Sequence, residues 1–214
     1  LGGNLLQQPR CWYYRLESYN CLKKGGGICF AINGENRYNV IFGGGPSYAA
    51  HPSNAAVALV ALNASLVLEG PKGTRTVAAG DFFTLPAENP WSENSLDVHE
   101  LLLEVRVPPA RGVRSVYEAV RERAAFDWPL VAVAVALRLE GGTVREARIV
   151  LGAVAPTPWR VPKAEQALLG KALDEDSAVA AARAATFGAA PLSDNGYKVD
   201  LVQVLVRRTL LAMA

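Results

Sequence analysis

The sequence predicts an α+β fold, with short apolar strands in the middle of the chain and Ala/Leu-rich helices at its end. Half of the 214 residues are hydrophobic and a fifth are charged, which is typical of a globular protein with a sizeable core. Glycine turns separate the strands into hairpins, and the helices follow them rather than alternate with them. This order favours antiparallel sheets with helices packed on one side.

The first half of the chain begins with a loop-rich stretch, residues 1–50, in which no apolar period of 2 or 3.6 persists. A helix is predicted over 55–62, with Ser53 or Asn54 as its N-cap. The strands that follow are separated by a Gly-Pro-Lys-Gly turn and a short helical turn over 79–83, and we expect them at 65–69, 74–78 and 99–107. Pro108-Pro109 ends the last strand, and residues 110–112 are the expected domain junction.

The second half predicts a three-stranded antiparallel meander packed on three helices. The strands are expected at 115–121, 130–139 and 144–154, the last two joined by a Gly-Gly hairpin. The helices are expected from apolar faces of period 3.6 at 163–171, 175–187 and 197–213. Asp174 and Asp176 are candidate caps for the middle helix.

Charge and hydropathy exclude several classes of protein. The formal net charge is +2, and no basic stripe interleaved with aromatic residues is present, so nucleic acid is not an expected partner. The longest apolar run, 128–137, is too short to span a bilayer. Leu1-Gly2-Gly3-Asn4 has neither the basic nor the apolar region of a signal peptide, so we expect a cytoplasmic protein without a membrane span. Because a Gly-Gly turn normally follows a strand or helix, we interpret Leu1 as a truncation point.

All three cysteines, Cys11, Cys21 and Cys29, fall within one short segment. An odd number excludes a pure disulfide framework, and the grouping indicates a local metal or cluster site. A 4Fe–4S cluster requires four ligands. Glycine triplets near the cysteines would let the chain wrap around such a cluster, and Ser47 stands where a fourth ligand could arrive.

Two simpler interpretations of the cysteines stay open. They could be buried apolar thiols without a ligand. They could also bind zinc, although their spacing lacks the CxxC pattern. A zinc site would need a fourth nitrogen or sulfur ligand, and His51 is the one available nearby.

Two motifs point to a known family: LGGNLLQQPRCWYYR at residues 1–15 and HPSN at 51–54. Together they resemble the FAD-binding subunit of the xanthine dehydrogenase family of molybdenum hydroxylases, in its aldehyde oxidoreductase and 4-hydroxybenzoyl-CoA reductase branch. Residues 1–109 resemble the second part of a PCMH-type FAD-binding domain, with a Cys-containing insertion at 11–47. Residues 112–214 resemble the C-terminal domain of carbon monoxide dehydrogenase flavoproteins.

The resemblance implies a set of cofactor contacts. A glycine turn lets backbone N–H groups approach a diphosphate. The positions that match FAD contacts of the family, or apolar residues near its flavin ring, are Gly2, Gly3, Asn4, Gln7, Ser53, Asn54, Leu101 and Leu102. Each also has an ordinary structural interpretation as a turn, a helix cap or a strand core. The resemblance further implies that Cys11, Cys21 and Cys29 hold an iron–sulfur cluster.

Several positions depart from the family pattern. The upstream part of the domain, which carries a further phosphate loop, is absent from the sequence, and Ser47 replaces the fourth cluster cysteine. Asn54 replaces an acidic residue, and Ala119 stands where many members have lysine. An intact 4Fe–4S cluster, a three-iron cluster, a cluster with a non-cysteine ligand and a lost cluster are all open.

The resemblance implies an oxidoreductase subunit that passes electrons from iron–sulfur centres through FAD to an external acceptor. The implied partners are a molybdopterin-binding large subunit and a 2Fe–2S small subunit. A partner's export signal could place the complex in the periplasm. No residue of this chain is then needed as an acid or base toward the organic substrate. The alternative is a degenerate scaffold subunit that has lost its cofactor.

Overall fold

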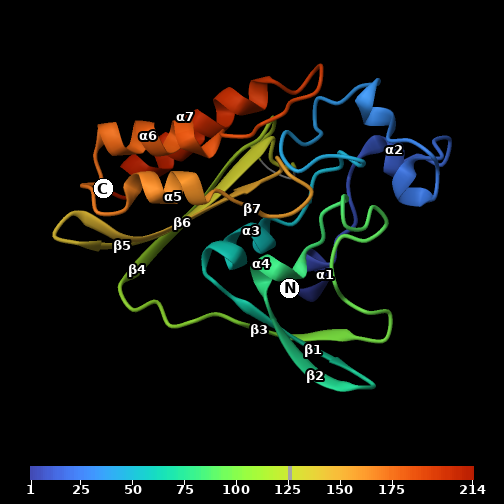
Figure 1. Cartoon of the computed structure of the whole chain (residues 1–214), viewed down its shortest axis with the longest axis horizontal. Coiled ribbons are helices and arrows are strands. Elements are labelled where there is room, and N and C mark those ends of the chain that lie inside the picture. Colours follow the sequence, from blue (N-terminus) through green and yellow to red (C-terminus); the bar gives the residue numbers. More distant parts are fainter. Residues whose placement is uncertain (125–126) are drawn as a thin grey trace.

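Two antiparallel sheets organise the computed structural model, which describes residues 1–124 and 127–214 (Figure 1). The first sheet has the order β2-β1-β3, and its strands are β1 Ser65–Gly70, β2 Gly73–Ala78 and β3 Leu101–Arg106. The second sheet has the order β4-β5-β6-β7, and its strands are β4 Val113–Val120, β5 Val131–Glu140, β6 Thr143–Gly152 and β7 Trp159–Arg160. Both predicted groups of strands are therefore present.

The second sheet is the predicted meander with one additional strand. The β5–β6 hairpin closes at Gly141 and Gly142, whose φ angles of 56° and 77° are those that a two-residue hairpin turn requires. The short β7 pairs with β6 through Trp159 opposite Leu151. The sequence did not predict β7, because a two-residue strand is too short for any alternation to be detected.

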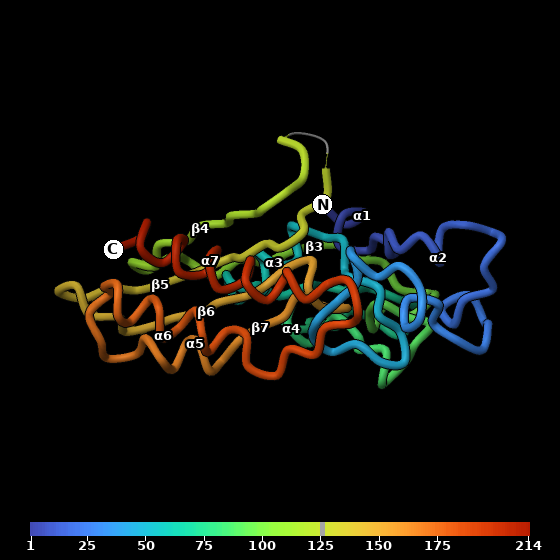
Figure 2. The backbone as a smooth tube through the Cα atoms, turned by 90° about the horizontal axis from the view of Figure 1, so that it is seen from above, coloured from blue at the N-terminus to red at the C-terminus, as the bar shows by residue number. Residues whose placement is uncertain are grey.

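Helices α5 Pro162–Leu168, α6 Glu175–Ala185 and α7 Tyr197–Leu211 cover one face of the second sheet (Figures 1 and 2). The odd-numbered residues of β5 point into this core, in company with Leu151 and Leu205. A capping box begins α6: Asp174 accepts from the Ser177 N–H at 2.9 Å, while the Ser177 hydroxyl accepts from the Asp174 N–H at 3.0 Å. Of the two candidate caps, Asp174 is therefore correct, and Asp176 lies inside the first turn.

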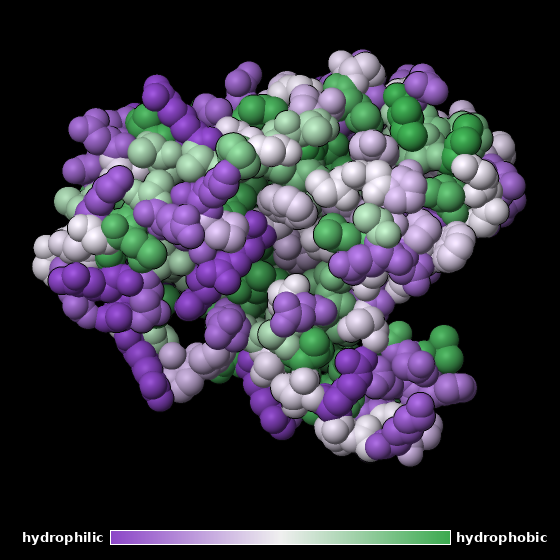
Figure 3. Space-filling view, in the orientation of Figure 1, coloured by the Kyte–Doolittle hydropathy of each residue, from purple (hydrophilic) through white to green (hydrophobic). Residues whose placement is uncertain are grey.

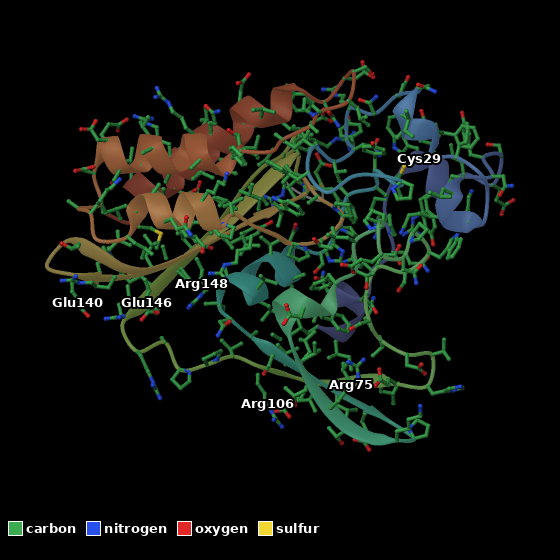
Figure 4. The ribbon with its side chains drawn as sticks, in the orientation of Figure 1. Cys29, Arg75, Arg106, Glu140, Glu146 and Arg148 are labelled. Atoms are coloured by element: carbon green, nitrogen blue, oxygen red, sulfur yellow. The ribbon has the colours of Figure 1, made fainter. Side chains whose placement is uncertain are left out.

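Helix α3 Asn54–Ala61 packs on the opposite face of the second sheet, against Ala134 and Val150. Ser53 is its N-cap, as predicted, and its hydroxyl accepts from the Ala56 N–H at 3.0 Å. At the other end of the helix, Arg148 of β6 donates from Nε to the Ala61 carbonyl oxygen at 2.7 Å (Figure 4). The second sheet is thus the middle layer between α3 and the three C-terminal helices.

The first sheet and the short helix α4 Ala79–Phe82 extend the core that surrounds α3. The predicted strand over 99–107 begins two residues late, because His99 lies inside a turn that the Glu100 N–H closes on the Asp97 carbonyl at 3.0 Å. The division into domains at residues 110–112 stays a prediction.

The N-terminal segment has little regular structure, as predicted. It contains α1 Gly2–Leu5, α2 Trp12–Arg15 and two single 3₁₀ turns, Leu22–Lys24 and Phe30–Ile32. Figures 1 and 2 place α2 and the loops beside it at the end of the molecule opposite the β5–β6 hairpin tip, whereas α1 lies nearer the middle. In the part of the chain that the structure describes, no helix is long and apolar enough to cross a membrane.

We expect Gly152→Ala to lower the free energy of unfolding by about 1–3 kcal/mol, because overpacked cores lose stability on this scale. A Cβ at Gly152 would lie 2.7 Å from Cγ2 of Val57 on α3, and a valine in a helix has one strongly preferred rotamer, so moving its side chain away is costly. Urea unfolding followed by circular dichroism measures the change.

Gly196→Ala is the matched control, because a Cβ there meets no atom within 4 Å and should leave stability nearly unchanged. The double variant Gly152→Ala/Val57→Ala should lose less than the sum of its two single variants. Additive losses would contradict the proposed contact between α3 and the sheet.

Candidate functional site

The structure brings the predicted cofactor residues Gly2, Asn4 and Ser53 together. The Ser53 hydroxyl donates to the Asn4 side-chain oxygen at 2.7 Å, and Gln7 donates from Nε2 to the Asn4 carbonyl oxygen at 2.9 Å. Residues 49 positions apart are thereby joined where α1 meets the start of α3. Asn54 is the first residue of α3 at the same junction.

Ser53 itself is a positioning residue in this arrangement. Only 1% of its surface is exposed, and its hydroxyl bonds to both Asn4 and the Ala56 N–H. That a cofactor touches Ser53 directly stays a prediction. The hydroxyl's bond to Asn4 fixes the amide that borders the glycine turn.

The two leucines of β3 differ in their surroundings. Leu102 is partly buried against the core around α3, and its Cδ2 would lie 4.0 Å from a Cβ at Gly2. Leu101 is 67% exposed, because adjacent strand residues point to opposite faces. Leu101 therefore points away from the face of β3 on which Leu102 approaches the glycine turn.

The glycine turn is compatible with the diphosphate of a dinucleotide. Gly2 and Gly3 lie in the first turn of α1, where N–H groups have no acceptor within the helix. A Cβ at Gly3 would meet nothing within 4 Å, so the backbone is open to a ligand. Free N–H donors and the Asn4 amide, with Leu102 beside Gly2, fit a phosphate group next to an apolar surface.

The three cysteines and Ser47 line one small cavity, together with Lys23. Lys23 is held in place there by an ion pair with Glu93 at 2.7 Å. Cys29 lies in this region at the end of the molecule (Figure 4). The spacing of these residues along the chain does not by itself predict that they meet. The structure brings all four predicted ligand positions together around this cavity.

Glycine allows the cysteine segment to turn this tightly. Gly25 adopts φ +91°, and a Cβ at Gly26 would collide with the carbonyl oxygen of Asn20. Burial raises the pKa of the Cys11 thiol. Hydrogen bonds from the Tyr14 N–H and from the Asn39 amide, 3.8 Å from the sulfur, lower this pKa by a smaller amount. The neutral thiol is therefore favoured in the absence of a bound cation.

The zinc hypothesis receives no support from the geometry. Within residues 1–124 and 127–214, no three His, Cys, Asp or Glu side chains are arranged to hold a single metal ion. A cubic iron–sulfur cluster attaches each thiolate to a different iron, so its ligands stand farther apart than those of one zinc ion. An iron–sulfur cluster at these cysteines stays a prediction.

A second, larger cavity of about 400 Å³ lies beside the cysteine cavity, and Cys11 borders both. No pattern in the sequence predicted this cavity. Its lining comes from the segments 10–13, 35–39, 50–52 and 127–130, with Glu122 and Ala153, and no periodic pattern relates segments so distant in the chain.

His51 forms part of the wall of this larger cavity. Its side chain is buried, packs edge-on against Phe83 with ring centroids 4.6 Å apart, and has no hydrogen-bond partner at either nitrogen. Burial lowers the pKa of His51 to about 4, so the imidazole is neutral at pH 7.

Side chains at the start of α7 hold the cavity wall in place. Asn195 donates to the carbonyl oxygens of Asn39 and Val40 at 3.2 and 3.1 Å. Lys198, which is 1% exposed, donates from Nζ to the carbonyl oxygens of Tyr38 and Ala153 at 3.1 and 2.9 Å. Desolvation lowers the pKa of Lys198 to about 7.

Two family models match the chain. The FAD binding domain in molybdopterin dehydrogenase matches residues 1–110, and the CO dehydrogenase flavoprotein C-terminal domain matches residues 115–213. The chain therefore belongs to the family of FAD-binding flavoproteins of molybdopterin dehydrogenases.

Individual relatives agree with this assignment. The aldehyde oxidoreductase FAD-binding subunit PaoB of Escherichia coli is 34% identical over 98% of this chain, and the carbon monoxide dehydrogenase medium chain of Hydrogenophaga pseudoflava is 38% identical over 78%. The chain spans 62% and 58% of the length of these relatives. A solved carbon monoxide dehydrogenase of H. pseudoflava matches with a TM-score of 0.66 and 37% identity, covering 74% of this chain and 55% of that one.

We expect His51 to make the protein less stable in mild acid. The folded state keeps the imidazole neutral down to about pH 4, whereas the unfolded chain protonates histidine near 6.5. Between these values the unfolded state binds more protons, so stability falls as the pH falls. From pH 7 to pH 5 the loss attributable to His51 is about 2 kcal/mol.

Urea unfolding at both pH values checks this, and His51→Phe should remove the loss. His99→Phe, at the exposed second histidine, should retain it. An equal pH dependence in all three proteins would show that His51 titrates normally.

Proposed function

We propose that this chain is the FAD-binding electron-transfer subunit of a molybdenum hydroxylase. The observation that carries the proposal is the junction of Gly2, Gly3, Asn4 and Ser53, which offers open N–H groups beside an ordered amide. The names of the relatives support it, since they are subunits of aldehyde and carbon monoxide oxidising enzymes. Bound FAD supplies reversible uptake of electrons, and the protein positions and tunes it.

Each residue of the proposed site has a distinct role. The Gly2 and Gly3 N–H groups bind a diphosphate oxygen, and the Asn4 amide hydrogen-bonds beside them. Ser53 and Gln7 hold Asn4 in position. Asn54 lies at the start of α3, where N–H groups favour negative charge. Leu101 and Leu102 provide the apolar surface for the flavin ring.

We further propose that Cys11, Cys21 and Cys29, with Ser47 as the fourth position, surround an iron–sulfur cluster. Their convergence on one cavity supports this. The match to PaoB extends over 98% of the chain, whereas that to the carbon monoxide dehydrogenase medium chain extends over 78%. Such a difference would arise if the cysteine-containing segment is shared with PaoB and absent from the carbon monoxide dehydrogenase medium chain.

The proposed partners are a molybdopterin-binding large subunit and a 2Fe–2S small subunit. Exposed apolar side chains on the N-terminal segment, where Figure 3 shows hydrophobic surface, support contact with other chains. These residues are Trp12, Leu16, Ile28 and Ile32. We place the complex in the cytoplasm, with a partner's export signal as the route by which it would reach the periplasm.

We expect Gly3→Ala to weaken flavin binding about ten-fold or more, because a methyl group would occupy the space through which a diphosphate approaches the backbone. The same variant should keep its stability, since a Cβ at Gly3 meets no atom within 4 Å. Flavin per chain, measured on the complex purified from the full-length gene, checks this.

Gly196→Ala is again the matched control, because a Cβ there is equally unobstructed. Full flavin occupancy in Gly3→Ala would place the diphosphate elsewhere. A wild-type complex without flavin would instead favour the degenerate scaffold.

We expect Cys21→Ala to remove the iron of one cluster from the complex while flavin stays bound, because the cluster loses a thiolate ligand. Ser47→Cys should retain or increase that iron, whereas Ser115→Cys, on an exposed position of β4, should not alter it. The partner subunits contribute the same iron to every variant, so a difference in iron content between variants measures the iron bound by this chain. Identical iron content in every variant would exclude the cluster and leave the flavoprotein.

A further inference from the structure

A buried asparagine, Asn39, is bonded to both ends of the proposed cluster ligand set. Only 6% of its surface is exposed. Its Nδ2 donates to the Tyr48 carbonyl oxygen at 2.9 Å and to the Cys11 sulfur at 3.8 Å. Cys11 is the first of the four proposed ligand positions, and Tyr48 directly follows Ser47, which is the last. One side-chain amide therefore joins the two ends of the set.

The hydrogen bond to Tyr48 determines which atom of the Asn39 amide faces Cys11. A backbone carbonyl oxygen only accepts hydrogen bonds, so the amide nitrogen, and not the amide oxygen, lies on this side. That nitrogen carries two N–H groups, which is one for Tyr48 and one for the cysteine sulfur. The Asn39 amide is therefore oriented as a donor toward sulfur.

The backbone of Asn39 is held independently of the cysteines. Asn195, which is fully buried just before α7, donates to the carbonyl oxygens of Asn39 and Val40 at 3.2 and 3.1 Å. The Val40 N–H donates in turn to the Tyr48 carbonyl oxygen at 3.1 Å. Because these bonds fix the donor in advance, no ordering is needed when the cysteines bind a ligand.

Cys11 is surrounded by more than one donor. The backbone N–H groups of Tyr13 and Tyr14 also point at its sulfur. In the part of the chain that the structure describes, Cys11 is the one cysteine whose sulfur accepts from a side chain. The donors that converge on this sulfur would stabilise negative charge on it.

We propose that Asn39 is a positioning residue of the iron–sulfur site: its amide joins Cys11 to the segment of Ser47 and donates to the Cys11 sulfur, which raises the reduction potential of the bound cluster. The three thiols that line one cavity with Ser47 are a donor set that iron binds. Uptake of one electron makes such a site more negative, and hydrogen bonds to its sulfur ligands stabilise the more negative state. The inference rests on the proposed cluster and makes no use of the flavin residues.

A reductive titration of the purified complex with dithionite, followed by electron paramagnetic resonance, tests the proposal. Asn39→Leu keeps the approximate size of the side chain and removes both N–H groups. We expect it to lower the equilibrium constant for reduction of this chain's cluster about five-fold, which is about 40 mV toward more negative potential for one electron. Asn39→His keeps an N–H donor and should shift the potential less. The Cys21→Ala complex supplies the signal of the partner subunits alone.

Asn36→Leu is the matched control, because Asn36 is another fully buried amide of the same stretch. Its side chain donates to the Ala31 carbonyl oxygen and to the Ser193 hydroxyl, and not to a cysteine. Its loss should leave the potential unchanged. Equal shifts in the two leucine variants would show that Asn39 is merely structural and would overturn the proposal.

Iron analysis of the same samples separates the remaining outcomes. An unchanged potential in Asn39→Leu with full iron would overturn this inference and leave the proposed cluster in place. If Asn39→Leu loses iron, Asn39→Asp keeps the shape, replaces the donor by an acceptor and should shift the potential further negative; an unchanged potential there would overturn the inference. A wild-type complex without iron on this chain would overturn the proposed cluster, and this inference with it.

Discussion

The attachment of residues 36–42 to the second half of the chain is the constraint on which the functional region depends. Buried side chains of Asn195 and Lys198 donate to backbone carbonyls of this stretch, and Asn36 accepts from the Asp194 N–H at 2.9 Å. The N-terminal segment has little regular structure of its own, so these bonds replace the ladder that a strand would provide. Losing one of them would leave buried polar groups without partners.

This attachment relates the three candidate sites to one another. The backbone that Asn195 and Lys198 hold in place forms part of the wall of the larger cavity. Cys11 lines both this cavity and the cysteine cavity. His51 lies two residues before Ser53, whose hydroxyl donates to Asn4. The larger cavity therefore adjoins the proposed cluster site through Cys11, and the segment that carries His51 leads to the proposed flavin site at Ser53. Adjacent sites of this kind suit a protein whose proposed role is to pass electrons between carriers.

The sequence predicted those parts of the structure that local physics determines. Periodicity located α3 and the strands of the β5–β6 hairpin, and the Ser53 and Asp174 caps followed from residue type. The family motifs nominated Asn4 and Ser53, which proved to be hydrogen-bonded to each other. Strand β7 could not be predicted because two residues are too few to show alternation. The larger cavity could not be predicted because it forms where distant segments meet.

An absorption spectrum of the purified full-length complex, recorded without oxygen and combined with flavin and iron analysis per chain, tests the central claim most directly. We expect flavin bands corresponding to one FAD per chain, with a broad iron–sulfur absorption that exceeds what the partner subunits contribute. A complex that contains all its subunits but no flavin would contradict the assignment of this chain as an electron-transfer flavoprotein and support the scaffold.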